Sequence, residues 1–256
     1  MWKKHSGFKK PKGKSKSLTI WRYMDFTKFV SLLETKSLFF SRVDMLLDPF
    51  EGSVTEMNLK ARNAFFNYVR RSGLPEEAMI QLRIDEPDLS KKWRKSVFVN
   101  CWGINKHESA AMWKLYLKSN EGIAIKSSYK NLKESFRDNL KDEVYIGEVK
   151  YIDYSSDFVS ERGFFIPFLC KRKSFEHERE LRAVVWNVDI AKAVDVGREP
   201  KEKGMYIKVD LDTLIDKICV APGVPEWFGE LVKSIVQRYG LEKEVVTSQL
   251  DRRPLF

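Results

Sequence analysis

The chain has 256 residues, of which 43% are hydrophobic and 13% aromatic, so it is long enough for a sizeable core in one large domain or two small ones. Its longest uncharged apolar run, 163–170, is far too short to span a membrane, and no apolar signal-peptide region follows the charged start. Three widely spaced cysteines without a CxxC motif argue against a disulfide framework or a thiolate metal site, and we expect a cytoplasmic protein.

The net charge of +10 is concentrated at the beginning of the chain. Residues 1–17 hold seven lysines and no acid, so the other 39 of the 46 basic residues face 36 acidic ones, which leaves +3. A lysine-rich arm of this kind is typically disordered and binds nucleic acid without sequence specificity. A solubilising tail with no partner is the alternative.

The first half of the chain predicts strands at 18–23, 37–41 and 95–102, the last ended by Gly103. Asp25 is a predicted N-cap for a short helix, and Asp48-Pro49 with Gly52 predicts an irregular loop. Two helices, 55–71 and 76–83, fall in a predicted helical insert near 55–92, and a further helix is predicted at 107–116.

The second half predicts strands and helices without regular βαβ alternation. The predicted strands are 123–125, 144–153, about 178 to 186, 204–210 after a polar loop, 217–222 and 245–247, and the predicted helices are 130–139 and 227–239. We therefore expect residues 18–256 to form a single α+β domain with a mixed, mostly antiparallel central sheet flanked by helices.

A charged stretch that runs into an apolar strand is the main candidate for chemistry. If the strand begins at about Glu178, alternation places Glu178, Glu180 and Arg182 on one face, with apolar residues on the other. Carboxylates two apart on a strand are about 7 Å from each other, near enough to raise one pKa unless a cation lies close. A solvent-facing strand edge, or a helical turn that pairs Glu178 with Arg182, is the alternative.

Several stretches, taken in order, carry a resemblance to a known family. They are Trp21-Arg22-Tyr23, Leu38-Phe39-Phe40-Ser41, Asp48-Pro49-Phe50-Glu51, Cys101-Trp102, Met112-Trp113 with Tyr116, Gly122-Ile123, and 175–182. Together they resemble the bacterial domain-of-unknown-function family twenty-nine seventy-one from about residue 18 to the C-terminus. The family name supplies no function.

The layout of that family resembles the three-part scheme of ADP-ribosyltransferases, which has a His or Arg on the first strand, a Ser or Tyr on a central strand, and a Glu on a later strand. The resemblance implies that Arg22 takes the first position and Glu178 or Glu180 the third. At the second position this chain departs from the pattern, because Trp102-Gly103 supplies no hydroxyl. Ser109 or Tyr116 could supply the polar contact instead.

NAD is the cofactor that this resemblance implies. Cleavage of its nicotinamide–ribose bond passes through an oxocarbenium-like state, which needs a nearby carboxylate, a group that fixes the dinucleotide, and an aromatic wall. The predicted catalytic residues are Glu178, Glu180 and Arg22, and the predicted cofactor-binding residues are Tyr23, Trp113, Tyr116 and Arg182. The target would be a nucleic acid or a protein, in a bacterial toxin or phage-defence setting.

Two other function classes fit the same residues. A metal-dependent nuclease could assemble Asp44, Asp48 and Glu51 with Glu178 and Glu180, although the common acid-x-Lys arrangement is absent. A non-enzymatic nucleic-acid-binding protein would use the charged strand structurally. The three histidines are too scattered to predict a zinc site.

Overall fold

The computed structural model describes residues 18–73, 87–117, 121–139, 141–160 and 163–256. The predicted arm at 1–17 and the predicted helix at 76–83 lie outside these ranges. Within the described residues, no helix has the length and hydropathy of a membrane span.

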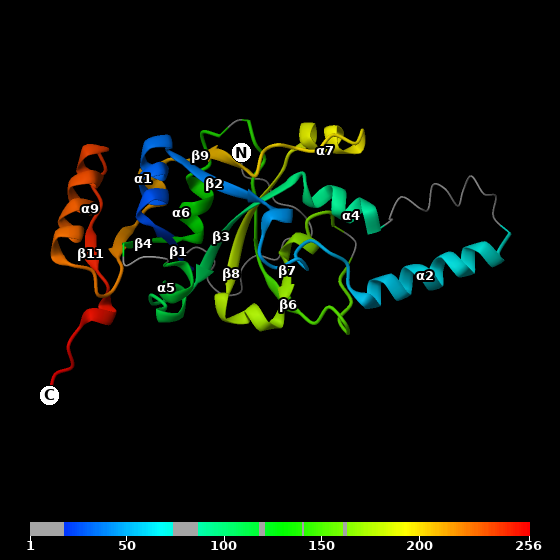
Figure 1. Ribbon diagram of the computed structural model, residues 1–256, viewed down its shortest axis with the longest axis horizontal. Coiled ribbons are helices and arrows are strands. Elements are labelled where there is room, and N and C mark those ends of the chain that lie inside the picture. Colours follow the sequence, from blue (N-terminus) through cyan, green and yellow to red (C-terminus); the bar gives the residue numbers. More distant parts are fainter. Residues whose placement is uncertain (1–17, 74–86, 118–120, 140, 161–162) are drawn as a thin grey trace.

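A mixed sheet forms the centre of the described molecule, as the sequence predicts (Figure 1). Its strands are β1 (Thr19–Asp25), β2 (Ser37–Arg42), β3 (Val97–Ile104), β4 (Gly122–Ser128), β5 (Tyr145–Glu148), β8 (Glu180–Trp186), β9 (Gly204–Lys208), β10 (Lys217–Val220) and β11 (Val245–Thr247). The main path runs β11-β10-β4-β1-β3-β2-β9, while β8 pairs with β3 and β5. Only β10 and β11 pair in parallel within this sheet; a separate parallel pair joins β6 (Lys150–Ile152) and β7 (Cys170–Arg172).

Helices flank the sheet and extend the molecule along its long axis (Figure 1). The α-helices are α1 (Phe26–Thr35), α2 (Glu56–Arg71), α4 (Pro87–Arg94), α5 (Ala110–Tyr116), α6 (Tyr129–Glu134), α7 (Val188–Asp195), α8 (Leu211–Leu214) and α9 (Glu226–Arg238). The 3-10 helices are η2 (Val43–Met45), η4 (Pro167–Leu169), η5 (Lys173–Glu178) and η6 (Gln249–Asp251). Helix α9 packs near β11 at one end, and α2 projects from the opposite end.

Strand β3 is the point at which the sheet divides. One edge of β3 pairs with β8 along its length, from Val97↔Trp186 to Gly103↔Glu180. The other edge pairs with β1 near its C-terminal end and with β2 near its N-terminal end. Strands β1 and β2 therefore separate beside the middle of β3.

The largest hydrophobic cluster lies between the sheet and the helices that cover one face. Helix α1 begins at the predicted N-cap Asp25, whose carboxylate accepts a hydrogen bond from the backbone N–H of Lys28 at 2.8 Å. It buries Phe29, Leu32 and Leu33, whose spacing of three and four residues places them on one helix face. This packing fixes the direction in which the chain leaves β1.

Several predicted boundaries are wrong. Gly103 does not end β3, because it is paired with Trp21 on one side and Glu180 on the other, and the strand continues to Ile104. The predicted polar loop before β9 contains α7, which is capped by Asn187 and buries Ala191 and Val194 at helical spacing. The helix predicted at 130–139 ends as an α-helix at Glu134.

Candidate active site

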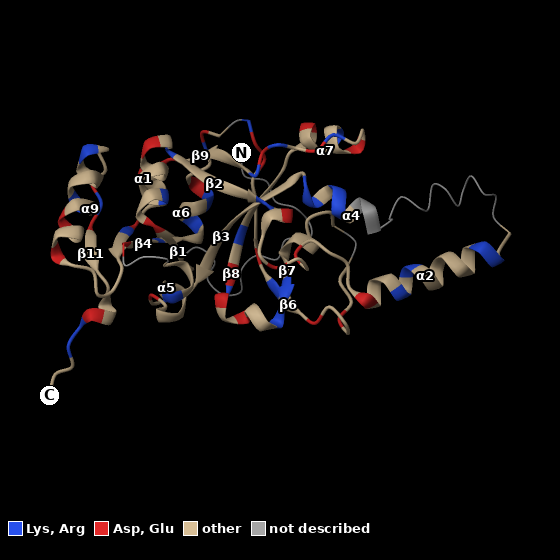
Figure 2. Ribbon diagram, in the orientation of Figure 1, with Lys and Arg blue, Asp and Glu red and all other residues tan. Residues whose placement is uncertain are grey.

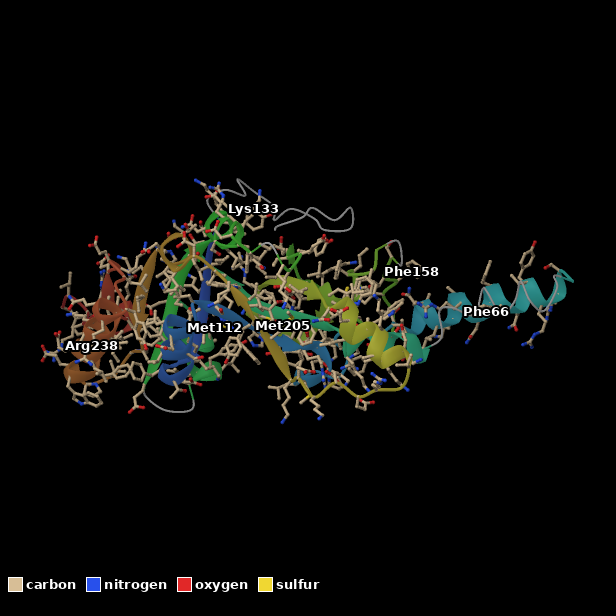
Figure 3. The ribbon with its side chains drawn as sticks, turned by 90° about the horizontal axis from the view of Figure 1, so that it is seen from above. Phe66, Met112, Lys133, Phe158, Met205 and Arg238 are labelled. Carbon is tan, nitrogen blue, oxygen red and sulfur yellow. The ribbon has the colours of Figure 1, made fainter. Side chains whose placement is uncertain are left out.

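A cleft of about 460 Å³ opens where β1 and β2 separate. The residues that line it come from β1, α1, β2, β3, α5, β8, β9 and the residue that follows η2. They are Trp21, Arg22, Tyr23, Met24, Lys28, Ser31, Leu32, Ser37, Leu38, Phe39, Ser41, Leu46, Val99, Cys101, Trp102, Gly103, Met112, Tyr116, Glu180 and Tyr206. In Figure 3, Met112 lies between Arg238 of α9 and Phe66 of α2, so the cleft is at neither end of the molecule.

Side chains take the place of strand pairing at the divided edge of β3. Arg22 donates from Nη1 to the carbonyl oxygen of Cys101 at 2.6 Å. Asn100 donates from Nδ2 to the carbonyl oxygen of Phe39 on β2 at 2.8 Å. These contacts satisfy backbone acceptors that continuous pairing would otherwise satisfy, so the sheet can open here without leaving them unpaired.

Five charged side chains form a buried group beside the cleft, which we call the ion cluster: Glu51, Lys171, Glu178, Glu180 and Arg182. The Nζ of Lys171 lies 2.6 Å from Oε1 of Glu180, 2.9 Å from Oε2 of Glu178 and 3.8 Å from Oε1 of Glu51. Arg182 holds the other oxygen of Glu180 through Nε at 2.8 Å, pairs with Glu51, and donates from Nη1 to the carbonyl oxygen of Phe168 at 3.0 Å. Glu180 is therefore held from both sides.

The two neighbouring glutamates reach this cluster from different backbone conformations. Strand β8 begins at Glu180, not at Glu178, which ends the 3-10 helix η5. Between them, Arg179 adopts a left-handed backbone conformation with φ of 45°, and this single residue connects the end of η5 to the start of β8. The predicted alternation holds for Glu180 and Arg182, with Leu181 in the hydrophobic core, whereas Glu178 reaches Lys171 through the turn.

Their positions give the two carboxyl groups opposite pKa shifts. Burial and the negative charge of Glu180 raise the pKa of Glu178 to about 7. Burial also acts to raise the pKa of Glu180, but Arg182 and Lys171 outweigh it and lower that pKa below its usual range. At neutral pH, Glu180 is thus ionised, and Glu178 is poised to gain or lose a proton.

Burial acts differently on the other polar groups of the cleft. It lowers the pKa of Arg22, although the neighbouring Cys101 and Tyr116 oppose the shift. It raises the pKa of Tyr116 and of the Cys101 thiol, and nearby carboxylates raise both further. The phenol and the thiol are therefore neutral at physiological pH, so Arg22 and Glu180 supply opposite charges to the cleft walls.

The three predicted aromatic residues occupy different places. Tyr23 and Tyr116 line the cleft. Trp113 is buried behind Tyr23, with the two rings edge to face at a centroid distance of 4.9 Å, and its Nε1 donates to Glu108 at 2.9 Å. The hydroxyl of Tyr23 accepts a hydrogen bond from the backbone N–H of Ser109 at 2.8 Å, so Ser109 supports Tyr23 as well as capping α5.

Of the seven predicted site residues, the cleft brings together Arg22, Tyr23, Tyr116 and Glu180. The lining does not include Glu178, Trp113 or Arg182. Trp113 packs against Tyr23 and Arg182 donates to Glu180, while Glu178 is linked to Glu180 through Lys171. Arg22 and Glu180 do not lie on neighbouring strands, because β3 separates β1 from β8. The pairs Trp21↔Gly103 and Gly103↔Glu180 instead form one row across the three strands, with the small Gly103 in the middle.

The acids of the nuclease alternative are dispersed or already paired with cations. Asp44 is bound by Arg42, with Nε at 2.6 Å from Oδ1, and Asp48 is bound by Arg172. Glu51 joins the ion cluster, where Lys171 and Arg182 occupy the positions between the carboxylates. In the described ranges, no group of three or more His, Cys, Asp or Glu residues is arranged to hold a metal ion.

Sequence reasoning missed several residues of the site. Lys171 comes from the three-residue strand β7, which is too short to show a period, and its partners lie in other segments. Phe39 and Tyr206 form an edge-to-face pair at 5.2 Å on the cleft wall, because β2 pairs with β9. Ser41 supplies a hydroxyl from β2 rather than from the central strand. Only strand pairing, which the sequence does not show, could have identified these residues.

Comparisons with known proteins give distant structural similarity alone. No family model and no curated protein matches the chain, so the resemblance to family twenty-nine seventy-one stays a prediction. The chain is similar to DarT of Thermus sp. 2.9 in complex with NAD+, with 8% identity, a TM-score of 0.42, and coverage of 94% of this chain and 99% of that one. It is also similar to the same DarT in complex with ADP-ribosylated ssDNA, with 9% identity, a TM-score of 0.39, and coverage of 92% and 95%. At this level the likeness assigns no residue and no activity to this chain.

Proposed function

We propose that this protein is an ADP-ribosyltransferase-like enzyme that uses NAD to modify a nucleic acid or protein target, in a bacterial toxin or phage-defence setting. The observation that carries the proposal is that Arg22 and the ionised Glu180, on strands that flank β3, line one cleft with aromatic side chains. The volume of about 460 Å³ lies within the usual range of ligand clefts, roughly 300–1,000 Å³.

Arg22 is proposed to fix the dinucleotide. Its guanidinium has five N–H donors, and the contact with Cys101 uses Nη1. The planar fork of an Arg matches phosphate oxygens, and charge-assisted hydrogen bonds of this kind are about twice as strong as neutral ones. An Arg on the wall of a partly apolar cleft can therefore hold a pyrophosphate in one orientation.

Glu180 is proposed to stabilise the positive charge that develops when the glycosidic bond to nicotinamide breaks. NAD supplies that bond and the ADP-ribosyl group. Because Lys171 and Arg182 hold one oxygen each, the carboxylate is ionised and fixed before substrate arrives. Each carboxylate oxygen can accept more than one hydrogen bond, so a ribose hydroxyl can still bind. Such preorganised electrostatic contacts are often the largest single contribution to catalysis.

Glu178 is proposed to donate or accept a proton near neutral pH. Its raised pKa lies in the range that suits a general acid or base, and Lys171 links its carboxylate to that of Glu180. Because Glu178 does not line the cleft, we expect its removal to matter less than removal of Glu180.

Tyr23 and Tyr116 are proposed to form the aromatic wall for nicotinamide. Trp113 and Arg182, predicted to bind the cofactor directly, are proposed to support Tyr23 and Glu180 instead. The missing central-strand hydroxyl is proposed to be replaced by Tyr116 or Ser41, both of which line the cleft.

The test incubates the purified full chain with labelled NAD and cell lysate, with and without magnesium or manganese. We expect nicotinamide release and label transfer, and we expect Glu180→Gln to lower turnover roughly a hundredfold or more while NAD binding persists. Metal-dependent cleavage of RNA or DNA without label transfer would instead support the nuclease alternative. If neither label transfer nor nucleic-acid cleavage is detected, the result would support a non-enzymatic binding protein.

A further inference from the structure

Helix α2 projects from the body of the molecule and is accessible around most of its circumference (Figures 1 and 3). Of its 16 residues, only Asn58 and Val69 are buried. Its N-terminus is anchored at Thr55, whose hydroxyl accepts from the backbone N–H of Asn58, and Asn58 in turn donates to the carbonyl oxygen of Val159 at 2.7 Å. The helix is thus held at its base and exposed beyond it.

Helix α2 and the adjacent α4 both carry more basic than acidic residues, and blue bands mark these positions in Figure 2. Their basic residues are Lys60, Arg62, Arg70, Arg71, Lys91, Lys92 and Arg94. Against these seven stand two acids, Glu56 and Asp88. This surplus of five equals the net charge of all the described residues, so the described residues outside the two helices carry no net charge. A surface of this charge attracts a polyanion.

Aromatic side chains lie among these charges. Phe65 and Tyr68 on α2 are 51% and 71% exposed. Near the base of α2, Phe50 is 39% exposed and carries the guanidinium of Arg172 over its ring at 4.7 Å. Exposed rings interleaved with cations are typical of surfaces on which unpaired bases stack.

A second cavity of about 280 Å³ lies at the base of the two helices. Arg62 lines it from α2, Trp93 from α4, Phe168 from η4, and Phe164 from the segment that precedes η4. Trp93 and Phe164 pack edge to face at 5.1 Å. The cavity therefore offers aromatic walls and a guanidinium, a combination that suits a planar base next to a phosphate.

This cavity shares a wall with the ion cluster. Gly52 and Phe168 line it, while the neighbouring Glu51 pairs with Arg182 and the carbonyl oxygen of Phe168 accepts from the same guanidinium.

We propose that α2 and α4, with the cavity at their base, bind a single-stranded nucleic acid. The phosphates contact the basic side chains of the two helices, and unpaired bases stack on Phe65, Tyr68 and the walls of the cavity. A duplex fits less well, because its bases are already stacked on each other and cannot reach the rings. Binding needs no NAD and does not rest on the proposed transferase activity.

The test measures binding of a fluorescent 15-nucleotide single strand, as DNA and as RNA, and of the matching duplexes to the full chain by anisotropy at several salt concentrations without NAD. Co-sedimentation measures binding to phosphatidylserine vesicles. The charge variant is Lys60→Gln/Arg70→Gln/Arg71→Gln, and the ring variant is Phe65→Ala/Tyr68→Ala. A matched control, Lys130→Gln/Lys233→Gln/Arg238→Gln, removes three exposed charges from α6 and α9, with α9 at the opposite end (Figure 3). All three proteins retain the arm at 1–17.

We expect each α2 variant to bind at least one of the two strands about tenfold more weakly or worse, with the control unchanged. The charge variant should also lower the slope of log K against log salt by about 2. Equal losses in the control and the α2 variants, or no loss in the α2 variants, would overturn the proposal. So would tighter binding of duplex than of single strand, or α2-dependent binding of phosphatidylserine vesicles alone.

Discussion

Strand β3 is paired along one edge and interrupted along the other. On the β8 edge the register is continuous from Val97↔Trp186 to Gly103↔Glu180, whereas on the other edge β1 and β2 each pair at two positions. The continuous edge fixes Glu180 in a buried ion cluster, and the interrupted edge opens the cleft that Glu180 faces. One strand thus supplies both rigidity and access, and substitutions on its two sides should have different consequences.

The largest expected effect is on the continuous edge. Arg182→Met should lower the free energy of unfolding by about 3–5 kcal/mol, because it leaves Glu51 and Glu180 buried with less compensation. Denaturant unfolding at pH 7 measures the change. Lys233→Met is the control: Lys233 pairs with Glu230 on the surface, and its loss should cost under about 1 kcal/mol. Equal effects would show that the cluster is not the anchor of this edge.

Glu178 should make stability depend on pH in an unusual direction. Its pKa is raised in the folded state, so between its unfolded value near 4.5 and about 7 the folded state binds more protons than the unfolded state. Stability contributed by this group is present below pH 4.5 and is lost as pH rises through 7, by up to about 3 kcal/mol.

Thermal unfolding at a series of pH values compares wild type with Glu178→Gln. The variant should lose less stability than wild type between pH 5 and 8. Parallel curves for the two proteins over this range would contradict the raised pKa.

On the interrupted edge, the main effect should be on binding rather than on folding. Arg22→Lys keeps the cation but loses the planar fork, so we expect KM for NAD to rise about tenfold, equivalent to about 1.4 kcal/mol, with kcat less affected. Steady-state nicotinamide release gives both constants. A fall in kcat with unchanged KM would argue that Arg22 acts on the reacting bond and not on the dinucleotide.

The smallest effect on the free energy of unfolding is expected at Gly103, which lies between Trp21 and Glu180 in the row across β1, β3 and β8. A Cβ added at Gly103 would meet its nearest atom, the carbonyl oxygen of Glu178, at 3.5 Å, which is ordinary contact. Gly103→Ser should therefore change the free energy of unfolding by less than about 1 kcal/mol while adding a hydroxyl to the cleft. A loss above that, measured by denaturant unfolding, would show that this row has no room for a side chain.

The sequence predicted local features well and long-range pairing poorly. The N-cap at Asp25, helix α2 and strand β1 depend on neighbours in the chain, and all were found. The cleft depends on which strands lie beside β3, and a strand pattern of period two does not encode that. Lys171 was missed for the same reason, since its partners Glu51 and Glu180 come from other segments. Glu178 was placed on a strand because the left-handed turn at Arg179 has no glycine or asparagine to mark it.

The alternation of Glu180, Leu181 and Arg182 also bears on errors during folding. If β8 slipped by one residue against β3, Leu181 would face Lys171 and the two charges would face the hydrophobic core. A slip by two residues would bring Arg182 to the place of Glu180, where it would repel Lys171. Either misaligned product buries a charge without its partner and is disfavoured by several kcal/mol. The same three residues that shape the site thus leave the strand a single correct alignment.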